Sequence, residues 1–342
     1  MPVLHLLGSA ADGGAETYFT SLTAALHRAG VGTAAAIRAH DGREAALAEA
    51  GVPLTVLPFA RLLDWRTPRR VAAMARQRHA EVLLAWMNRA ASHTPEGDWA
   101  RIGRLGGYYD LKYYRGFDAL VGNTADIRDW IVRQGCPAEH AHYIPNFAEA
   151  DATAAPLDRL AFDTPEKAPL LLGMGRLHPS KGHDVTLRAL MQLPDAWLWI
   201  AGSGPLQAQL EGLARDLGVA DRVRFLGWRD DASALYRTAD AVVFPSRYEP
   251  LGNVVIQAWA HGVPVAAAAS AGPAALIRNG EDGLLVPMDD PDALAQAARR
   301  LIGDQALRFG LIECGRRRLR EEFSRELVVE RWRGLFSAYG AS

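Results

Sequence analysis

Cysteine, net charge and long apolar runs are all scarce in this chain of 342 residues. The two cysteines, Cys136 and Cys314, lie far apart without partners at metal-ligand spacing, which indicates a reducing compartment. The net charge of −1 argues against a nucleic-acid-binding protein, which would usually have a strongly basic face. No apolar run reaches the ~18 residues of a membrane span, and no signal-peptide pattern begins the chain, so we expect a cytoplasmic protein.

Short apolar runs alternate with longer helical patterns, which is typical of parallel α/β architecture. The hydrophobic content of 49% over 342 residues can fill two domain cores, since single cores stop growing near ~250–300 residues. Six strands are expected in the first half, at Val3–Leu7, Thr33–Ile37, Leu54–Pro58, Glu81–Trp86, Ala119–Val121 and His142–Ile144. Six more are expected in the second half, at Leu170–Met174, Trp197–Ala201, Val223–Leu226, Ala241–Phe244, Val263–Ala267 and Gly283–Val286.

Two doubly wound, Rossmann-like α/β domains are therefore predicted, at residues 1–155 and 156–322, followed by a C-terminal segment at 323–342. The stretch Ala148–Pro169, rich in Ala, Pro and Asp, is interpreted as the linker. Ligands of open α/β folds bind at the carboxyl ends of the strands, so we expect a cleft between the two domains.

The most informative segment is the turn and helix with the sequence SRYEPLGNVVIQAWAHGVPV, from Ser246 to Val265. A helix that starts near Asn253 would offer free N–H groups and a positive dipole end, which suit a phosphate. Glu249 and Gln257 lie eight residues apart, so we expect both to face one ligand from the same side. A carboxylate pairs with hydroxyl groups rather than with phosphate, so the ligand should contain both phosphate and sugar.

A second motif, GMGRLHPSKGHD, follows the first strand of the second domain and places Arg176 and Lys181 on one loop. Two cations that converge at a strand end are costly unless an anion lies between them, and a diphosphate leaving group fits that need. The alternative is a solvated surface loop.

Two glycine turns complete the set of possible ligand contacts. Gly13 and Gly14 stand between the first strand and a helix, where a backbone without side chains can approach an anion. Gly202 and Gly204 end the second strand of the second domain. A purely structural turn is an equal alternative for both pairs.

In this order the motifs resemble those of the retaining GT-B glycosyltransferases of group 1, the family 4 type. The resemblance is strongest over Leu170–Pro287, with G-x-G-R-L, K-G, G-x-G, F-L-G, F-P-S, the acidic turn and helix, and D-G-L-L-V-P. It implies a GT-B fold, a UDP- or GDP-linked sugar as donor rather than a bound cofactor, and a C-terminal helix, Phe323–Ala338, that returns to the first domain.

The resemblance also implies roles for individual residues. Arg176 and Lys181 would hold the donor diphosphate, and Glu249 would bind hydroxyls of the transferred sugar. The backbone amides of Leu251, Gly252 and Asn253 would meet the phosphates. Gln257 stands where the family usually has a second glutamate on the ribose, which predicts a weaker hydrogen bond. His93 occupies a position near the transferred sugar in many relatives, with Asn88 and Arg89 as further candidates; a surface or turn position is the alternative for His93.

The resemblance implies a metal-independent reaction on one face of the sugar, in which the leaving diphosphate deprotonates the acceptor. Positioning and charge stabilisation would then supply the catalysis. The single D-x-D sequence, Asp290-Pro291-Asp292, is interpreted as the start of a helix rather than a metal site.

Two surface patterns point to the acceptor. Arg61–Arg78 holds six arginines and one acidic residue among interleaved apolar residues, which fits either a helix on anionic lipid or a solvated helix face. The tyrosines at 108, 109, 113 and 114 form either an acceptor wall or ordinary packing. The cluster Arg316–Arg320 is expected to be a solvated helix face.

Three functions fit these features. The first is a hexosyltransferase that acts on a lipid-linked or glycan acceptor, in lipopolysaccharide or other envelope assembly. The second is a sugar-nucleotide epimerase of the same fold, which would release a free epimerised sugar. The third is a non-catalytic sugar-nucleotide-binding protein, for which Gln257 is the argument.

Overall fold

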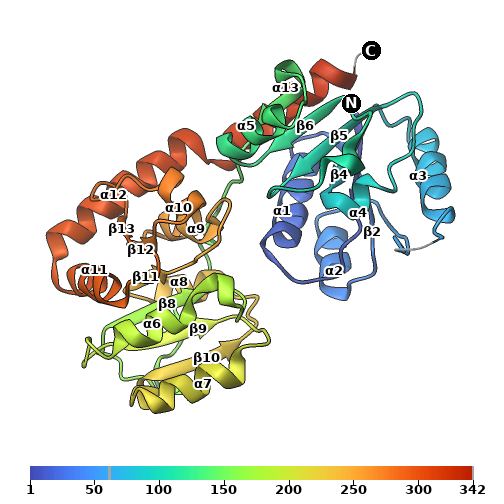
Figure 1. The fold of residues 1–342 in the computed structure, drawn as a ribbon. Coiled ribbons are helices and arrows are strands. Elements are labelled where there is room, and N and C mark those ends of the chain that lie inside the picture. Colours follow the sequence, from blue (N-terminus) through green and yellow to red (C-terminus); the bar gives the residue numbers. More distant parts are fainter. Residues whose placement is uncertain (61–62, 341–342) are drawn as a thin grey trace. The chain divides into compact units, whose positions relative to one another are not determined.

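The computed structural model describes residues 1–60 and 63–340 and divides into two compact units (Figure 1). Unit 1 comprises Met1–Asn146 and Arg325–Ser342, and unit 2 comprises Phe147–Ser324. Each unit contains a parallel sheet with its own buried core. Within the described residues, none of the helices combines the length and apolar content needed to cross a bilayer.

The sheet of unit 1 has the strand order β3-β2-β1-β4-β5-β6-β7. Its strands are apolar along nearly their whole length because helices cover both faces of a parallel sheet. The strands are β1 Pro2–Leu7, β2 Gly32–Ile37, β3 Leu54–Val56, β4 Val82–Trp86, β5 Ala100–Leu105, β6 Ala119–Gly122 and β7 Ala141–Tyr143. The helices of this unit are α1 Gly14–Arg28, α2 Asp41–Glu49, α3 Arg66–Gln77, α4 Met87–Ala91, α5 Ala125–Arg133 and α13 Arg325–Gly340.

The sheet of unit 2 has the strand order β10-β9-β8-β11-β12-β13. Its strands are β8 Leu170–Met174, β9 Trp197–Ala201, β10 Val223–Gly227, β11 Ala241–Phe244, β12 Val265–Ala268 and β13 Leu284–Val286. Its helices are α6 His183–Leu190, α7 Gln207–Asp216, α8 Ala232–Thr238, α9 Asn253–His261, α10 Ala271–Leu276, α11 Pro291–Gly303 and α12 Gln305–Glu322. All six strands expected in this half are present.

One strand of unit 1, β5, has no counterpart among the strands expected from the sequence. Arg101 and Arg104 interrupt the apolar run of β5, so the hydrophobic pattern did not indicate a strand there. Arg104 is nevertheless buried, and its guanidinium lies 4.7 Å from the centre of the Trp86 ring and donates to Asn146. Aromatic faces and an amide thus replace the apolar contacts that a buried strand position usually makes.

The segment expected to link the domains is bound to unit 2. The N–H of Asp151 donates to Ser233 Oγ at 3.1 Å, and the N–H of Leu157 donates to Thr238 Oγ1 at 2.7 Å. The division therefore falls after Asn146 rather than after residue 155. At the other end of the chain, α13 (red in Figure 1) belongs to unit 1, where Tyr339 Oη lies 2.9 Å from Nε2 of His142.

Two expectations about charged residues had different outcomes. Asp290 caps α11 as expected: its side chain accepts from the N–H of Ala293 at 2.8 Å, and Pro291 stands in the first turn. The expectation of a solvated face for Arg316–Arg320 is wrong at Arg318, which is buried. Its guanidinium pairs with Asp282 at 3.0 Å and lies 5.2 Å from the centre of the Trp259 ring, so an acid and an aromatic face together accommodate the buried charge.

Candidate functional site

Two residues of unit 2 that were predicted to bind the nucleotide-sugar donor lie where the winding of the sheet reverses. The chain leaves β8 toward β9 on one side and leaves β11 toward β12 on the other, so β8 and β11 are neighbours with diverging connections. Ligands of open α/β sheets bind at such a point, beyond the carboxyl ends of the strands. Lys181 follows β8 and Glu249 follows β11.

Lys181 and Glu249 form an ion pair at this point, with Nζ 2.5 Å from Oε2. Their side chains are 19% and 14% exposed, so the pair is largely withdrawn from water, yet a ligand can still reach it. The other carboxylate oxygen of Glu249 accepts from the N–H of Gly252 at 3.2 Å. The acidic side chain therefore joins the lysine loop to the start of α9.

Arg247 holds the two loops together, and its role was missed by the sequence analysis. Its guanidinium binds Asp184 at 2.7 and 2.8 Å and Asp289 at 2.5 Å, and these hydrogen bonds and charges raise its pKa. Its backbone N–H donates to Ser180 O at 2.9 Å, one residue before Lys181. The two acids are distant in sequence, so no local motif marks this contact.

The start of α9 is as expected, with Glu249 on the turn before the helix. Because Glu249 lies outside the helix, its spacing from Gln257 is not a helical one, and contact of both residues with one ligand stays a prediction. Gly252 caps α9 with φ of 89°, a conformation that glycine adopts without strain. The Leu251 side chain is buried in the core, so only backbone groups of this residue can serve a ligand. Asn253 is the first residue of the helix.

Gln257 lies inside α9 and accepts a hydrogen bond from the hydroxyl of Tyr236 at 3.1 Å. Tyr236 is fully buried and stacks on His261, with ring centres 4.6 Å apart. The side-chain oxygen of Gln257 is thus oriented by a fixed donor that would also serve a carboxylate.

Arg176 and Gly204 were also predicted to contact the nucleotide-sugar donor, and neither takes part in the Lys181–Glu249 ion pair. Arg176 is exposed, and no side chain among the described residues pairs with its guanidinium. Gly204 packs tightly, because a Cβ there would lie 2.5 Å from Leu177 O. This close packing is a structural explanation for a glycine at position 204. Contact of Gly204 with a donor stays a prediction.

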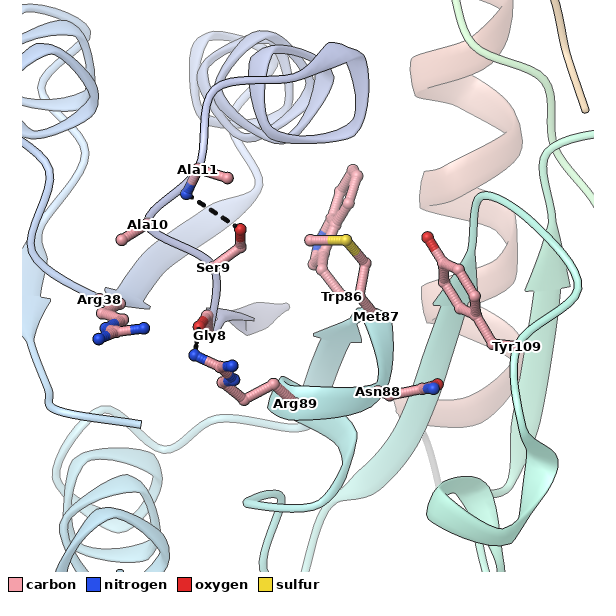
Figure 2. Close-up of a pocket in the computed structure, with 10 residues that line it drawn as sticks. All are labelled: Gly8, Ser9, Ala10, Ala11, Arg38, Trp86, Met87, Asn88, Arg89 and Tyr109. Atoms are coloured by element: carbon pink, nitrogen blue, oxygen red, sulfur yellow. Dashed lines mark hydrogen bonds between the residues drawn. The ribbon is translucent and has the colours of Figure 1, made fainter. Parts of the chain in front are cut away.

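Unit 1 contains a pocket of about 570 Å³ at the corresponding place in its sheet, beyond the ends of β1, β2, β4 and β5. Figure 2 shows Arg38 and Arg89 at one side of it and Asn88 and Tyr109 at the other. The pocket is lined by Gly8, Ser9, Ala10, Ala11, Arg38, Trp86, Met87, Asn88, Arg89 and Tyr109. Gly13 and Gly14 come after this lining segment, where α1 begins.

His93 is buried below α4 and is not among the residues that line the pocket. Its Nδ1 lies 2.8 Å from Arg89 O, and its Nε2 lies 3.5 Å from a carboxylate oxygen of Asp64. Of the three candidates after β4, Asn88 and Arg89 therefore line the pocket, whereas His93 supports the turn that presents them. A role of His93 at the sugar stays a prediction.

A strained backbone position and an aromatic side chain both belong to the lining of the unit 1 pocket. Met87, directly after β4, has φ of 62°, which is costly for a residue with a side chain and is often found at functional sites. Among the tyrosines, Tyr109 lines the pocket, whereas Tyr114 is buried in the core of the unit. Ordinary packing is confirmed for Tyr114, and Tyr109 also packs against the core, so an acceptor role of Tyr109 stays a prediction.

Comparison with known proteins adds family evidence to this geometry. The model of "Glycosyl transferases group 1" matches residues 168–304, and that of "Glycosyltransferase Family 4" matches residues 12–152. The chain is 37% identical over 331 residues to the lipopolysaccharide core biosynthesis glycosyltransferase LpsE of Rhizobium meliloti, with 96% of each chain covered. It is 36% identical over 344 residues to LpsD of the same organism, with 98% of each covered.

A solved structure supports the fold over the full chain. HepE of Anabaena, in complex with UDP and glucose, matches with a TM-score of 0.83 at 21% identity, over 99% of this chain and 100% of that chain. This likeness confirms the two-sheet GT-B fold class that the sequence predicted.

Proposed function

Because this chain belongs to the group 1 glycosyltransferases of family 4, we propose that it transfers a hexose-type sugar from a nucleotide sugar to an acceptor hydroxyl, with retention of the anomeric configuration. The observation on which this rests is the Lys181–Glu249 ion pair, which joins the loop after β8 to the turn before α9 and places a cation and a carboxylate beside the first backbone N–H groups of that helix. These are the groups that a sugar diphosphate needs.

The donor is proposed to be UDP- or GDP-linked. HepE, which shares the fold, was solved with UDP and glucose, and this favours a uridine donor. Lys181 and Arg176 would stabilise the departing diphosphate, and Glu249 would orient the sugar through its hydroxyls. Because side chains and the α9 terminus supply the positive charge, we propose that the reaction proceeds without a metal ion, and therefore in EDTA.

The acceptor is proposed to belong to the lipopolysaccharide core, because LpsE and LpsD bear that role in their names and match this chain nearly end to end. Such an acceptor is lipid-linked, so the enzyme would work at the cytoplasmic side of a membrane. The surface formed by Leu63, Trp65, Arg66, Arg69 and Arg70, here termed the α3 surface, supports that location.

On the α3 surface, Leu63 is 95% exposed and Trp65 is 57% exposed. The guanidinium of Arg69 lies 4.8 Å from the centre of the Trp65 ring. Val71 is buried and Met74 packs on the core, so the apolar residues on this surface are confined to the start of α3. Apolar and cationic side chains in one exposed patch suit the interface of an anionic bilayer. Arg61 and Leu62 of the predicted segment lie outside the described residues.

The donor proposal is tested by thermal shift of the full chain with UDP, GDP, ADP and their sugar conjugates. A ligand that binds the folded state raises its melting temperature. We expect one nucleotide series to do so, with the sugar conjugate giving the larger shift. Glu249→Gln should remove that extra shift but retain or increase the shift with the bare nucleotide, since an amide oxygen can still accept from Gly252 N–H and no longer holds Lys181 in an ion pair. Absence of a shift with every nucleotide would contradict the proposal.

A further inference from the structure

We propose that the pocket of unit 1 binds an anionic group of the acceptor, a carboxylate or a phosphate monoester. The identification of the occupant as the acceptor rests on the proposed function; the preference for an anion rests on the pocket alone. Two arginines, Arg38 from the end of β2 and Arg89 from α4, line the pocket, and its described lining contains no acidic side chain. Guanidinium groups bind carboxylates and phosphates through paired hydrogen bonds.

Backbone carbonyl oxygens of the loop that forms the pocket wall already accept hydrogen bonds from an arginine. Arg43 donates to Ser9 O at 3.0 Å and to Ala11 O at 2.9 Å. The nearby acids are engaged as well: Glu16 accepts from Ser9 Oγ at 2.7 Å, and Asp12 lies 2.8 Å from His40. Neither carboxylate belongs to the lining, so the charged side chains among the described lining residues are the two arginines.

A third arginine lies behind the wall. Arg104 is 2% exposed and stacks on Trp86, which lines the pocket, and on Tyr18. No carboxylate among residues 1–60 and 63–340 pairs with it; its side-chain partner is the neutral amide of Asn146. A buried charge without a counter-ion is costly, and an anion in the adjacent pocket would offset that cost.

The polar residues opposite the arginines fit a sugar. Figure 2 shows Asn88 and Tyr109 on the side of the pocket away from Arg38 and Arg89, and Asn88 Oδ1 is buried without a protein hydrogen-bond partner among the described residues. An amide and a phenol bind hydroxyl groups, and a pocket of about 570 Å³ accommodates a ring with one charged substituent. Met87, the residue before Asn88 and Arg89, has the positive φ described above, so the pocket contains a strained position.

The test is calorimetric titration of the full chain with three probes: methyl glucuronide, glucose 6-phosphate and the neutral methyl glucoside. We expect at least one anionic probe to bind about tenfold or more tightly than the neutral one. Arg38→Gln should remove that preference, because Arg38 is exposed and its loss does not disturb packing. Arg28→Gln, an exposed arginine at the end of α1, is the matched control and should retain it.

Equal affinity for the charged and neutral probes, or no binding of either anionic probe, would overturn the proposal. A parallel titration with UDP identifies the source of the anion. If Arg38→Gln weakened UDP as much as the anionic sugar, the pocket would serve the donor diphosphate and the proposal would be wrong. If the anion preference holds in a chain that transfers no sugar, the proposed transferase function fails and the anion site stands.

Discussion

Lys181 and Glu249 neutralise each other across the two strand ends where the sheet of unit 2 reverses its winding, with 2.5 Å between Nζ and Oε2. Lys181 was expected to be one of two cations that need an external anion. Glu249 supplies that anion for Lys181, so a donor diphosphate would compete with Glu249 for the ammonium group. The carboxylate, once released, would be available for the sugar hydroxyls.

Loss of either cation should slow transfer without unfolding the chain. Lys181→Ala and Arg176→Ala are each expected to cost ~2–4 kcal/mol of transition-state stabilisation, as the loss of an electrostatic stabiliser typically does. Arg176 is exposed, so its removal should change the melting temperature little. Removal of Lys181 leaves Glu249 without its ion-pair partner and should lower the melting temperature, so the activity of that variant is measured well below it. The control is Lys167→Ala, which removes an exposed lysine of the same unit. A kcat/KM near the wild-type value in either variant would refute the diphosphate assignment.

Replacement of Gln257 should strengthen nucleotide binding. Gln257→Glu is expected to gain about 1 kcal/mol, the difference between typical neutral and charge-assisted hydrogen bonds. The Tyr236 hydroxyl can donate to either side chain, so the position of the residue should be preserved. Calorimetry with the bare nucleotide and the nucleotide sugar should give equal gains, because the ribose is common to both. Unchanged affinity would mean that residue 257 does not contact the ribose.

Binding to anionic vesicles should depend on the α3 surface. The full chain is expected to sediment with vesicles that contain phosphatidylglycerol, and less so as salt rises. Replacement of Arg66, Arg69 and Arg70 by glutamate should abolish this binding. A triple variant with the exposed residues Arg28, Arg133 and Arg215 changed to glutamate carries the same charge change and should still bind. Equal binding to neutral vesicles would rule out the electrostatic explanation.

Two buried histidines should make the chain sensitive to mild acid. Burial lowers the pKa of His5 to about 3 and that of His183 to about 4, from an ordinary value of 6.5. The folded state therefore binds fewer protons than the unfolded state below pH 6.5, so stability is full above pH 6.5 and falls toward the folded pKa values. The slope should approach 1.4 kcal/mol per pH unit for each histidine.

The check is a series of melting temperatures between pH 7.5 and 5, a range above the ordinary pKa of carboxylates. His5→Leu should reduce the slope below pH 6.5 whatever its effect on absolute stability, because only the wild type has this group to protonate. A wild-type melting temperature that is the same at pH 7 and pH 5 would contradict this prediction.

Much of unit 2 was predictable because its sequence is locally consistent. Its strands are apolar runs without charges at their centres, and Lys181 and Glu249 each follow such a run, so their meeting at one sheet edge follows from parallel topology. Their direct ion pair was not predictable from local sequence, because the two loops are joined by contacts of Arg247 with Asp184 and Asp289. Those partners lie 63 and 42 residues away in the chain.

Unit 1 was harder to predict for two physical reasons. Strand β5 contains Arg104, whose burial relies on the rings of Tyr18 and Trp86 rather than on an apolar side chain. At the end of β4, a positive φ at Met87 reorients the next residues, so Asn88 and Arg89 line the pocket while His93 turns inward toward Asp64. Neither feature has a signature in residue order.

The central claim, retaining sugar transfer, is tested most directly by proton NMR of a reaction that contains the nucleotide sugar chosen by thermal shift. The acceptor is lipopolysaccharide isolated from cells in which the gene for this chain has been deleted. We predict stoichiometric release of the nucleoside diphosphate and a new glycosidic linkage whose anomeric coupling matches the configuration of the donor. Inversion of that configuration, release of a free epimerised sugar, or an unconsumed donor would contradict the account.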